Sequence, residues 1–272
     1  MRMKANCKIN IGLDILRRRA DGYHDLESVM LPVRELFDTL EVESMASPGV
    51  EFTSSGLVID CPPEKNLVVR ACRLMQERYG VEGLRVHLEK RVPFGAGLGG
   101  GSSDATMALR AVNECYHLGL GPEELEQIAS ELGSDTPFFV RNIPQFCSGR
   151  GEQMTPIDLP LAGKWLLLVK PEVAISTREA YAGVKPHLPA TPLKELLALP
   201  IEQWQGRVKN DFEASLFGPY PLLAQIKGEL LAMGALYAAM SGSGSTLFGI
   251  FEQRPSWEGH FEGIFCHCEE FK

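Results

Sequence analysis

The stretch Pro93–Thr106, PFGAGLGGGSSDAT, decides the fold of this 272-residue chain. Five glycines and two serines in fourteen residues are too flexible for ordinary core or for a stable helix interior. A turn of this kind directs successive backbone N–H groups into a concavity, and here it leads directly into a helix. The start of a helix carries about half a positive charge and unpaired amides, which favour a phosphate group. We therefore expect a phosphate chain to bind at this loop.

Three alternatives fit this stretch less well. Gly95, Gly97 and Gly100 satisfy the dinucleotide pattern G-x-G-x-x-G. However, residues 84–92 before them alternate apolar and polar side chains, whereas a central parallel strand is apolar throughout. A Walker P-loop requires Lys and then Ser or Thr after the glycines, and serines stand where the lysine should be. A merely tight turn with a helix cap does not need five glycines.

The segments around the loop predict an α+β protein. Residues 84–92 have the alternation of a half-buried strand. The helix after the loop is expected to begin with Ser102 and Ser103 as caps and to stop at Gly119. Its apolar face contains Ala105, Ala108, Leu109, Val112, Cys115 and Tyr116. A second helix is expected from Gly121-Pro122 to Gly133, and two successive helices favour α+β over a plain βαβ repeat.

The proline-rich residues 154–163 predict a boundary between domains 1–155 and 156–272. Beyond it we expect a strand at 165–169 and a helix opened by the capping box Ser176-x-x-Glu179. A later helix is predicted to end at Gly234 and to bury Leu222, Ile226, Leu230 and Met233. A strand at 235–240 then leads into a second glycine–serine loop, SGSGST, at 241–246.

Composition restricts the class of protein. A formal net charge of −8 argues against a nucleic-acid-binding surface, which is normally basic. The seven cysteines are scattered and odd in number, and no signal peptide or membrane-spanning segment is apparent in the sequence. We expect a cytoplasmic protein with reduced thiols, a small-molecule substrate and no nucleic-acid or membrane partner, as a monomer or weak homodimer.

Three motifs together resemble the GHMP kinases. The loop at 93–106 is similar to the family's P-x-G-x-G-L-G-S-S, and residues 240–251, MSGSGSTLFGIF, resemble its third motif. Residues 8–28, KINIGLDILRRRADGYHDLES, are similar to a substrate-side signature K-x-N…R-x-D-G-Y-H, and GRGE (149–152) and NDFE (210–213) also fit. The resemblance covers nearly the whole chain. It implies a two-domain α+β fold, with an N-terminal domain like domain 2 of ribosomal protein S5 and a ferredoxin-like C-terminal domain.

The resemblance also implies a reaction. ATP with Mg²⁺ would phosphorylate the 2-hydroxyl of a diphosphocytidyl-linked methylerythritol, in the non-mevalonate route to isoprenoid precursors. No metal ligands are assigned. Asn66 has the alternative role of a helix cap, and Lys90 that of a surface residue. The residues implied to contact ATP are Pro93, Gly95, Ala96, Gly97, Leu98, Gly99, Gly100, Gly101, Ser102, Ser103, Asn66 and Lys90.

Asp135 and Lys8 are the catalytic residues that the resemblance implies. Asp135, in GSDTPFF, would polarise or deprotonate the substrate hydroxyl, although a turn or cap aspartate is the alternative. Lys8, on a probable first strand, would keep that carboxylate ionised and stabilise the transferring phosphate. The alternative for Lys8 is a solvated strand face.

The substrate end is assigned in the same way. Tyr23 would stack on the cytosine and His24 would hydrogen-bond the base. Tyr181 would supply a second stacking face, with core or interface as its alternative. Asn10 shares the strand face of Lys8 and would contact the cytidine or diphosphate.

Three rival functions follow from the same residues. A sister kinase acting on homoserine, mevalonate or a sugar would have no use for a base-stacking turn at Gly22–His24. A non-catalytic nucleotide-binding protein would have no reason to keep both Lys8 and Asp135. A dinucleotide oxidoreductase is disfavoured by the strand that precedes the glycine loop.

Overall fold

The computed structural model describes residues 1–59 and 61–272, and these residues form two compact units. The first unit comprises residues 1–8, 32–94 and 99–143, and the second comprises residues 9–31, 95–98 and 144–272. The two long strands β1 (Arg2–Arg18) and β2 (His24–Met45) contribute residues to both units. The glycine-rich stretch is likewise shared.

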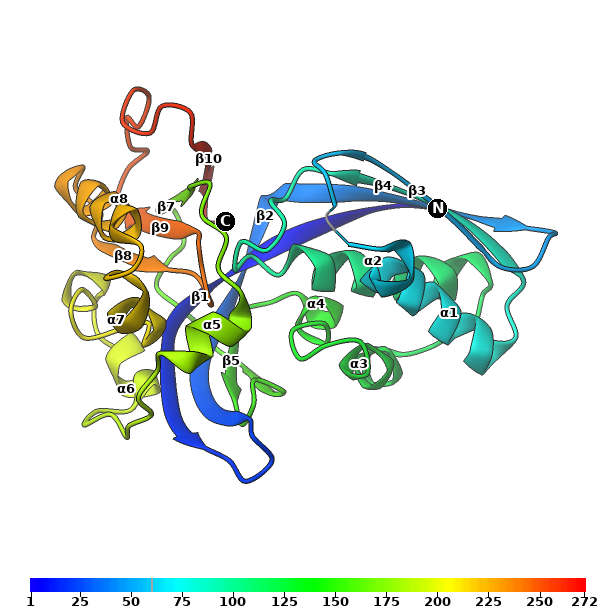
Figure 1. The fold of residues 1–272 in the computed structure, drawn as a ribbon, viewed down its shortest axis with the longest axis horizontal. Helices are drawn as coiled ribbons and strands as arrows, with labels where there is room; N and C mark the ends of the chain where they lie inside the picture. The colour runs from blue at the N-terminus through cyan, green and yellow to red at the C-terminus, as the bar shows by residue number, and fades with distance from the viewer. Residues whose placement is uncertain (60) are drawn as a thin grey trace. The chain divides into compact units, whose positions relative to one another are not determined.

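A β-sheet covered by helices builds the first unit (Figure 1). β3 (Val50–Gly56) pairs in parallel with β4 (Gly83–Lys90), and the second half of β2 pairs with β4 antiparallel. The predicted strand at 84–92 is therefore confirmed as β4. Its alternation buries Leu84, Val86 and Leu88 on one face and leaves the residues between them more exposed.

The helices of the first unit pack on that apolar face. α1 (Leu67–Tyr79) and α2 (Gly100–Cys115) lie side by side in Figure 1, and their buried residues join those of the sheet in one core. The remaining helices are η1 (Pro63–Lys65), α3 (Pro122–Ser130) and α4 (Phe138–Arg141). Two successive helices after the glycine loop are confirmed.

The predicted end of the first of these helices is wrong. α2 ends at Cys115, and His117, two residues before Gly119, adopts the left-handed conformation that terminates it, with φ of +51°. The N–H groups of Leu118 and His117 donate to the carbonyls of Asn113 and Glu114 at 3.0 and 3.3 Å, as in a Schellman motif. The second helix, α3, also stops earlier than predicted, at Ser130.

A four-stranded antiparallel sheet forms part of the second unit, in the order β10-β7-β9-β8. Its strands are β7 (Trp165–Lys170), β8 (Tyr237–Met240), β9 (Leu247–Phe251) and β10 (Phe265–Glu270). In chain order this is fourth, first, third, second, which is the order of a ferredoxin-like sheet. Turns rather than a second crossover helix connect β9 to β10. The second unit also contains β5 (Gln145–Ser148), paired with the first half of β2, and β6 (Gln153–Pro156).

The helices of the second unit are α5 (Thr177–Ala182), α6 (Leu193–Leu197), η2 (Ile201–Gln203), α7 (Phe212–Leu216) and α8 (Pro221–Ala232). Apolar side chains of α5, α7 and α8 share one buried cluster with this sheet. Ser176 caps α5 as predicted, accepting the Glu179 N–H at 3.1 Å. On α8 the buried residues are Leu223, Ile226 and Leu230, so the predicted burial of Leu222 is wrong. The fold is mixed α+β, as the sequence predicted.

All seven cysteines are free thiols. Within residues 1–59 and 61–272, every helix is too short or too polar to cross a bilayer.

Candidate active site

The start of α2 carries the phosphate-binding prediction. Gly99 is its N-cap, in the left-handed conformation with φ of +68°. A Cβ at this position would lie 2.9 Å from the Lys8 Cε and 3.1 Å from the Phe139 ring, so only glycine fits. Ser102 and Ser103 lie inside the helix, and no side chain caps it, which makes the predicted serine caps wrong. The first turn of α2 therefore keeps its amides available for an anion.

Lys8 and Asp135 form an ion pair beside this helix start. The Lys8 Nζ lies 3.3 Å from the Asp135 Oδ2, and the two side chains are 4% and 35% exposed. Burial of Lys8 contradicts the alternative of a solvated strand face. The loop that carries Asp135 is fastened to α2, because the Thr106 hydroxyl donates to the Thr136 carbonyl at 2.8 Å. A cation, a partly exposed carboxylate and a helix N-terminus thus lie together in the first unit.

Lys90 forms a second, fully buried cluster with two carboxylates. Its Nζ donates to Asp104 Oδ2 at 2.9 Å and also to Asp38 Oδ2. It lies 3.1 Å from the position that a Cβ on Gly100 would occupy, directly beside the start of α2. Asp38 Oδ1 also accepts the N–H of Val92 at 2.8 Å, which holds the chain that leads into the glycine loop. The alternative of a surface role for Lys90 is wrong, since the side chain is 2% exposed.

The buried charges perturb one another. Burial alone lowers the pKa of the Lys90 ammonium, but Asp104 and Asp38 outweigh it, and the net pKa lies above the ordinary lysine value. Desolvation raises the pKa of Asp104 well above its usual range, although Lys90 opposes the shift. One ammonium therefore serves two carboxylates.

Asn66 is the N-cap of α1. Its side-chain oxygen accepts the Val68 N–H at 2.9 Å. The cap alternative is therefore confirmed, and nothing in this geometry tests an additional contact with ATP.

Gly95–Leu98 lies in the second unit, against the second glycine–serine loop. The Ser241 hydroxyl donates to the Gly97 carbonyl at 2.8 Å, and the Thr246 N–H donates to the Ala96 carbonyl at 3.2 Å. A Cβ on Gly97, whose φ is +74°, would overlap the Ser241 carbonyl. The two glycine motifs are therefore hydrogen-bonded to each other. In the sequence, only the resemblance to the family related them.

Side chains from β1 and from the NDFE motif support this contact. The Asn10 N–H donates to the Ser241 hydroxyl at 3.1 Å, and its side-chain amide donates to Ser28 at 2.9 Å. Asn210 donates to the carbonyls of Met240 and Gly242 at 2.7 and 2.8 Å. Asn10 is 5% exposed, so it is built into the unit rather than displayed on its surface.

Exposure divides the remaining residues implied for ATP. Gly95 is exposed, whereas the buried residues are Ala96, Leu98, Gly100 and Ser103. The partly exposed residues are Pro93, Gly97, Gly99, Gly101 and Ser102.

The Gly22–His24 turn lies in the second unit with Tyr181. The His24 ring stacks on the Tyr181 ring, with 5.0 Å between centroids and 23° between planes. Tyr181 also meets Phe212 edge to face at 4.9 Å. Tyr23 is 58% exposed, and its ring lies 5.1 Å from the Arg150 guanidinium. His24 is therefore stacked on Tyr181, whereas the Tyr23 ring lies against Arg150.

Sequence reasoning missed the buried partners of Lys90 and the supports of the two loops. Asp38 left a signal, because it interrupts the apolar strand segment LFDTLEV. A carboxylate in such a strand indicates a buried partner. Asn210 and Ser241 stand in the NDFE and MSGSGST motifs, but the motifs did not identify their partners, which lie in distant segments.

Family models match both halves of the chain. The model described as GHMP kinases N terminal domain matches residues 66–142, and GHMP kinases C terminal matches residues 193–256. The chain is 48% identical over 265 residues to a 4-diphosphocytidyl-2-C-methyl-D-erythritol kinase of Parabacteroides distasonis, covering 97% of this chain and 95% of that protein. A Shouchella clausii protein of the same name is 36% identical over 275 residues, covering 98% and 91%.

Solved structures agree. A crystal structure of 4-(cytidine 5'-diphospho)-2C-methyl-D-erythritol kinase matches with a TM-score of 0.84 and 32% identity, covering 100% of both chains. A homoserine kinase from Cytophaga hutchinsonii matches in fold, with a TM-score of 0.67, 18% identity and coverage of 96% and 93%. The chain therefore belongs to the GHMP kinases, in the family of the 4-diphosphocytidyl-2-C-methyl-D-erythritol kinases.

Proposed function

We propose that this chain transfers the γ-phosphate of ATP to the 2-hydroxyl of 4-diphosphocytidyl-2-C-methyl-D-erythritol in the non-mevalonate isoprenoid pathway, and releases ADP. The observation that carries the proposal is the Lys8–Asp135 ion pair beside the start of α2. Phosphoryl transfer to an alcohol requires a proton acceptor, compensation of phosphate charge and alignment of two oxygens. The names of the curated relatives support the choice of substrate.

Asp135 acts on the hydroxyl in this proposal. Its carboxylate accepts the hydroxyl proton as the oxygen forms a bond to the γ-phosphorus and the bond to the bridging β,γ-oxygen breaks. Lys8 holds Asp135 in place at 3.3 Å and offers positive charge where the transferring phosphate gathers negative charge. The partial exposure of Asp135 allows a substrate oxygen to reach it.

The residues of the glycine loop fit a phosphate chain. α2 begins at Gly100 without a side-chain cap, and the buried Ser103 hydroxyl has no hydrogen-bond partner among the described residues. Backbone amides and hydroxyls of this kind suit the phosphates of ATP. Mg²⁺ would enter with ATP and neutralise phosphate charge. We assign it no protein ligands, and no group of three or more His, Cys, Asp or Glu in residues 1–59 and 61–272 is arranged to hold a metal.

The turn that carries Tyr23 and His24 takes the cytosine in this proposal. Tyr23 presents an exposed ring, and Tyr181 supplies a second ring in the same unit. A stacked base is worth about 1–3 kcal/mol in single-stranded nucleic-acid complexes, and a similar gain is expected here. Burial lowers the pKa of His24, which keeps its imidazole neutral at pH 7, able to donate one hydrogen bond and accept another. Asn10 is assigned to the cytidine diphosphate end.

The test is ADP release with magnesium-ATP and one of three alcohols: the diphosphocytidyl substrate, mevalonate or homoserine. We expect turnover with the first alone. Asp135→Asn should lower kcat by about 10²–10⁴-fold, the usual contribution of a general base. The exposed Asp158→Asn is the matched control and should keep wild-type kcat. Turnover with another alcohol would overturn the substrate assignment, and an active Asp135→Asn would overturn the assignment of the base.

We further propose that the protein acts in the cytoplasm as a monomer or weak homodimer, without nucleic-acid partners. The absence of a disulfide among the seven described cysteines supports a reducing compartment. Sedimentation at micromolar concentration tests the assembly state.

A further inference from the structure

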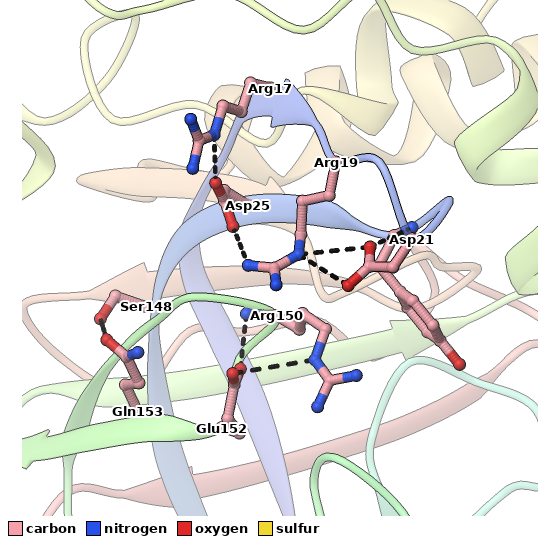
Figure 2. A network of polar contacts seen from close by, with 9 residues as sticks. Arg17, Arg19, Asp21, Asp25, Ser148, Arg150, Glu152 and Gln153 are labelled. Atoms are coloured by element: carbon pink, nitrogen blue, oxygen red, sulfur yellow. Dashed lines mark hydrogen bonds and ion pairs between the residues drawn. The ribbon is translucent and has the colours of Figure 1, made fainter.

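The hairpin loop between β1 and β2 contains a compact cluster of charged residues (Figure 2). The Arg19 Nε lies 3.0 and 3.3 Å from the two Asp21 carboxylate oxygens, and its Nη1 lies 2.8 Å from Asp25 Oδ1. Arg17 reaches the other Asp25 oxygen at 2.5 Å. Arg19 therefore bridges two carboxylates on opposite sides of the loop. The planar guanidinium suits this bridge because it presents its donors in a fixed fork, whereas an ammonium has no such preset geometry.

This cluster is connected to the backbone of the turn that carries Tyr23. The Asp21 Oδ1 accepts the Tyr23 N–H at 3.1 Å. The Arg19 N–H donates to the Tyr23 carbonyl at 2.8 Å, and the Arg19 carbonyl accepts the Gly22 N–H at 3.2 Å. Gly22, with φ of +86°, allows the reversal. The position of Tyr23 is thus set by Arg19 and Asp21, through one side-chain and two backbone contacts.

The charges of the cluster persist at neutral pH. Hydrogen bonds from Arg19 and then Arg17 hold the pKa of Asp25 below its ordinary value. Partial burial raises the pKa of Asp21, but the hydrogen bonds from the Tyr23 N–H and Arg19 outweigh it, and the net pKa is lower than usual. Both carboxylates remain partners for Arg19 across the working range of a cytoplasmic enzyme.

Arg150, from the GRGE motif, supports the other side of the turn. Its guanidinium lies 5.1 Å from the centroid of the Tyr23 ring. Glu152 holds Arg150 in turn, accepting its N–H at 2.5 Å and lying 3.7 Å from its Nε (Figure 2). Arg150 therefore contacts the exposed ring of Tyr23, whereas Arg19 and Asp21 hold its backbone.

We propose that Arg19 and Asp21, with Asp25 behind them, are positioning residues that pre-organise the Gly22–His24 turn for the cytosine base. The inference rests on the proposed function, because it assigns the turn to that base. Because the turn is ordered before binding, the free energy of substrate binding includes no cost for ordering it. We therefore expect these residues to affect substrate affinity rather than the rate of the chemical step.

The test compares Arg19→Ala, Asp21→Ala and the double variant with Arg2→Ala as the matched control. Arg2 is on the same strand β1 and is 69% exposed, and its side chain pairs with Glu41, outside the cluster. We expect Arg19→Ala to raise KM for the diphosphocytidyl substrate and Kd for free CDP by roughly tenfold. The variant loses the ion pairs with both Asp21 and Asp25, and each exposed pair accounts for only part of a tenfold change in affinity. KM for ATP, kcat and the Tm should stay near wild type. Arg19→Lys should fail to restore affinity, and the double variant should show less than the sum of the two single effects.

Unchanged KM and Kd in both Arg19→Ala and Asp21→Ala would overturn the inference. A loss shared equally by kcat, both KM values and Tm would also overturn it, because that pattern describes a folding defect. Asp21 has an exposed side chain, so its variant keeps the test decisive if Arg19→Ala folds poorly. A wild-type protein that neither binds CDP nor turns over the diphosphocytidyl substrate would instead overturn the proposed function. Calorimetry with CDP and the ADP-release assay, both on the wild type, distinguish that outcome.

Discussion

Lys90 is the residue whose structural role departs furthest from its sequence prediction. Its ammonium contacts two buried carboxylates, Asp38 and Asp104, beside the start of α2. Removing one partner of a buried charged cluster is more destabilising than replacing the whole cluster with apolar residues, because the remaining charges stay buried without compensation. The cluster therefore determines how the glycine loop enters its helix, whatever contact Lys90 makes with ATP.

We expect Lys90→Met to lower the free energy of unfolding by about 3–5 kcal/mol, the usual cost of leaving buried charges unpaired. Urea denaturation at pH 7 measures it. The exposed Lys65→Met is the matched control and should change the free energy of unfolding by less than about 0.5 kcal/mol. A Lys90→Met protein as stable as the control would mean that the carboxylates find other compensation.

Asp104→Asn should change stability far less than Lys90→Met. Desolvation raises the pKa of Asp104, so the native state holds a proton there at a pH where the unfolded state does not. Stability consequently falls as pH rises from the unfolded pKa towards the folded one, and the amide removes that fall. Adding Asp104→Asn to Lys90→Met should recover part of the lost stability, and a strictly additive pair would contradict direct coupling.

Asp14 predicts a pH dependence that is separate from catalysis. Burial first, then the charges of Asp211 and Glu27, raise the pKa of Asp14 to about 6. The unfolded state releases this proton near pH 4 and the native state near pH 6, so stability falls between these values and the penalty is complete above pH 6. Its size is on the order of 2–3 kcal/mol.

We expect Asp14→Asn to be more stable than wild type at pH 7 and to flatten the stability profile between pH 4 and 6. Urea midpoints at four pH values measure this. Asp158→Asn, at an exposed position, should keep the wild-type slope. A wild-type profile that rises from pH 4 to 6 with the same slope in Asp14→Asn would refute the assignment.

At the scale of the element, α1 depends on a single side chain for its start. Asn66 is followed by a helix whose buried face packs on the sheet, and its oxygen satisfies the Val68 N–H. Loss of such a cap costs about 1 kcal/mol. Capping of α1 is therefore a sufficient reason for an asparagine at position 66, with or without a contact to ATP.

Two substitutions separate these roles. Asn66→Ala should lower the free energy of unfolding by about 1 kcal/mol, whereas Asn66→Asp keeps a capping oxygen and should stay near wild type. If Asn66 also contacts ATP, both variants should raise KM for ATP. A KM for ATP that stays constant in Asn66→Asp would leave the residue with its capping role alone.

At the scale of the whole molecule, the chain cannot be divided at one point without breaking a core. Residues 9–31 belong to the same compact unit as residues 144–272. Leu13, Ile15 and Leu26 join the apolar cluster formed by the sheet and helices that follow residue 156. The predicted boundary at 155/156 divides the sequence, but the second unit also contains residues 9–31, from β1 and β2, which precede that boundary.

We therefore expect a fragment of residues 156–272 not to fold cooperatively by itself. Its cluster would lose the side chains of β1 and β2 and expose apolar surface worth several kcal/mol. Circular dichroism of the fragment during heating should lack the sigmoidal transition of the full chain. Cooperative melting of the isolated fragment would show that the boundary at 155/156 delimits an independent domain.

Helix and strand type were determined by the sequence alone, because they depend on neighbours within a few residues. The alternation of β4 and the helical spacing of α2 are of this kind. Helix ends were less predictable. His117 terminates α2 two residues before Gly119, which is also left-handed, because the hydrogen bonds from the His117 and Leu118 N–H groups close the helix at Cys115.

Only the tertiary structure decided which charges meet. Lys90 and Asp38 are 52 residues apart, and the register of β2 against β4 brings both to the start of α2. Lys8 and Asp135 come from β1 and from the loop after α3, and the same packing joins them. Periodicity identifies a buried face but does not identify its partner, because register and packing are set by contacts between distant segments. The pairings at the candidate site are therefore properties of the fold.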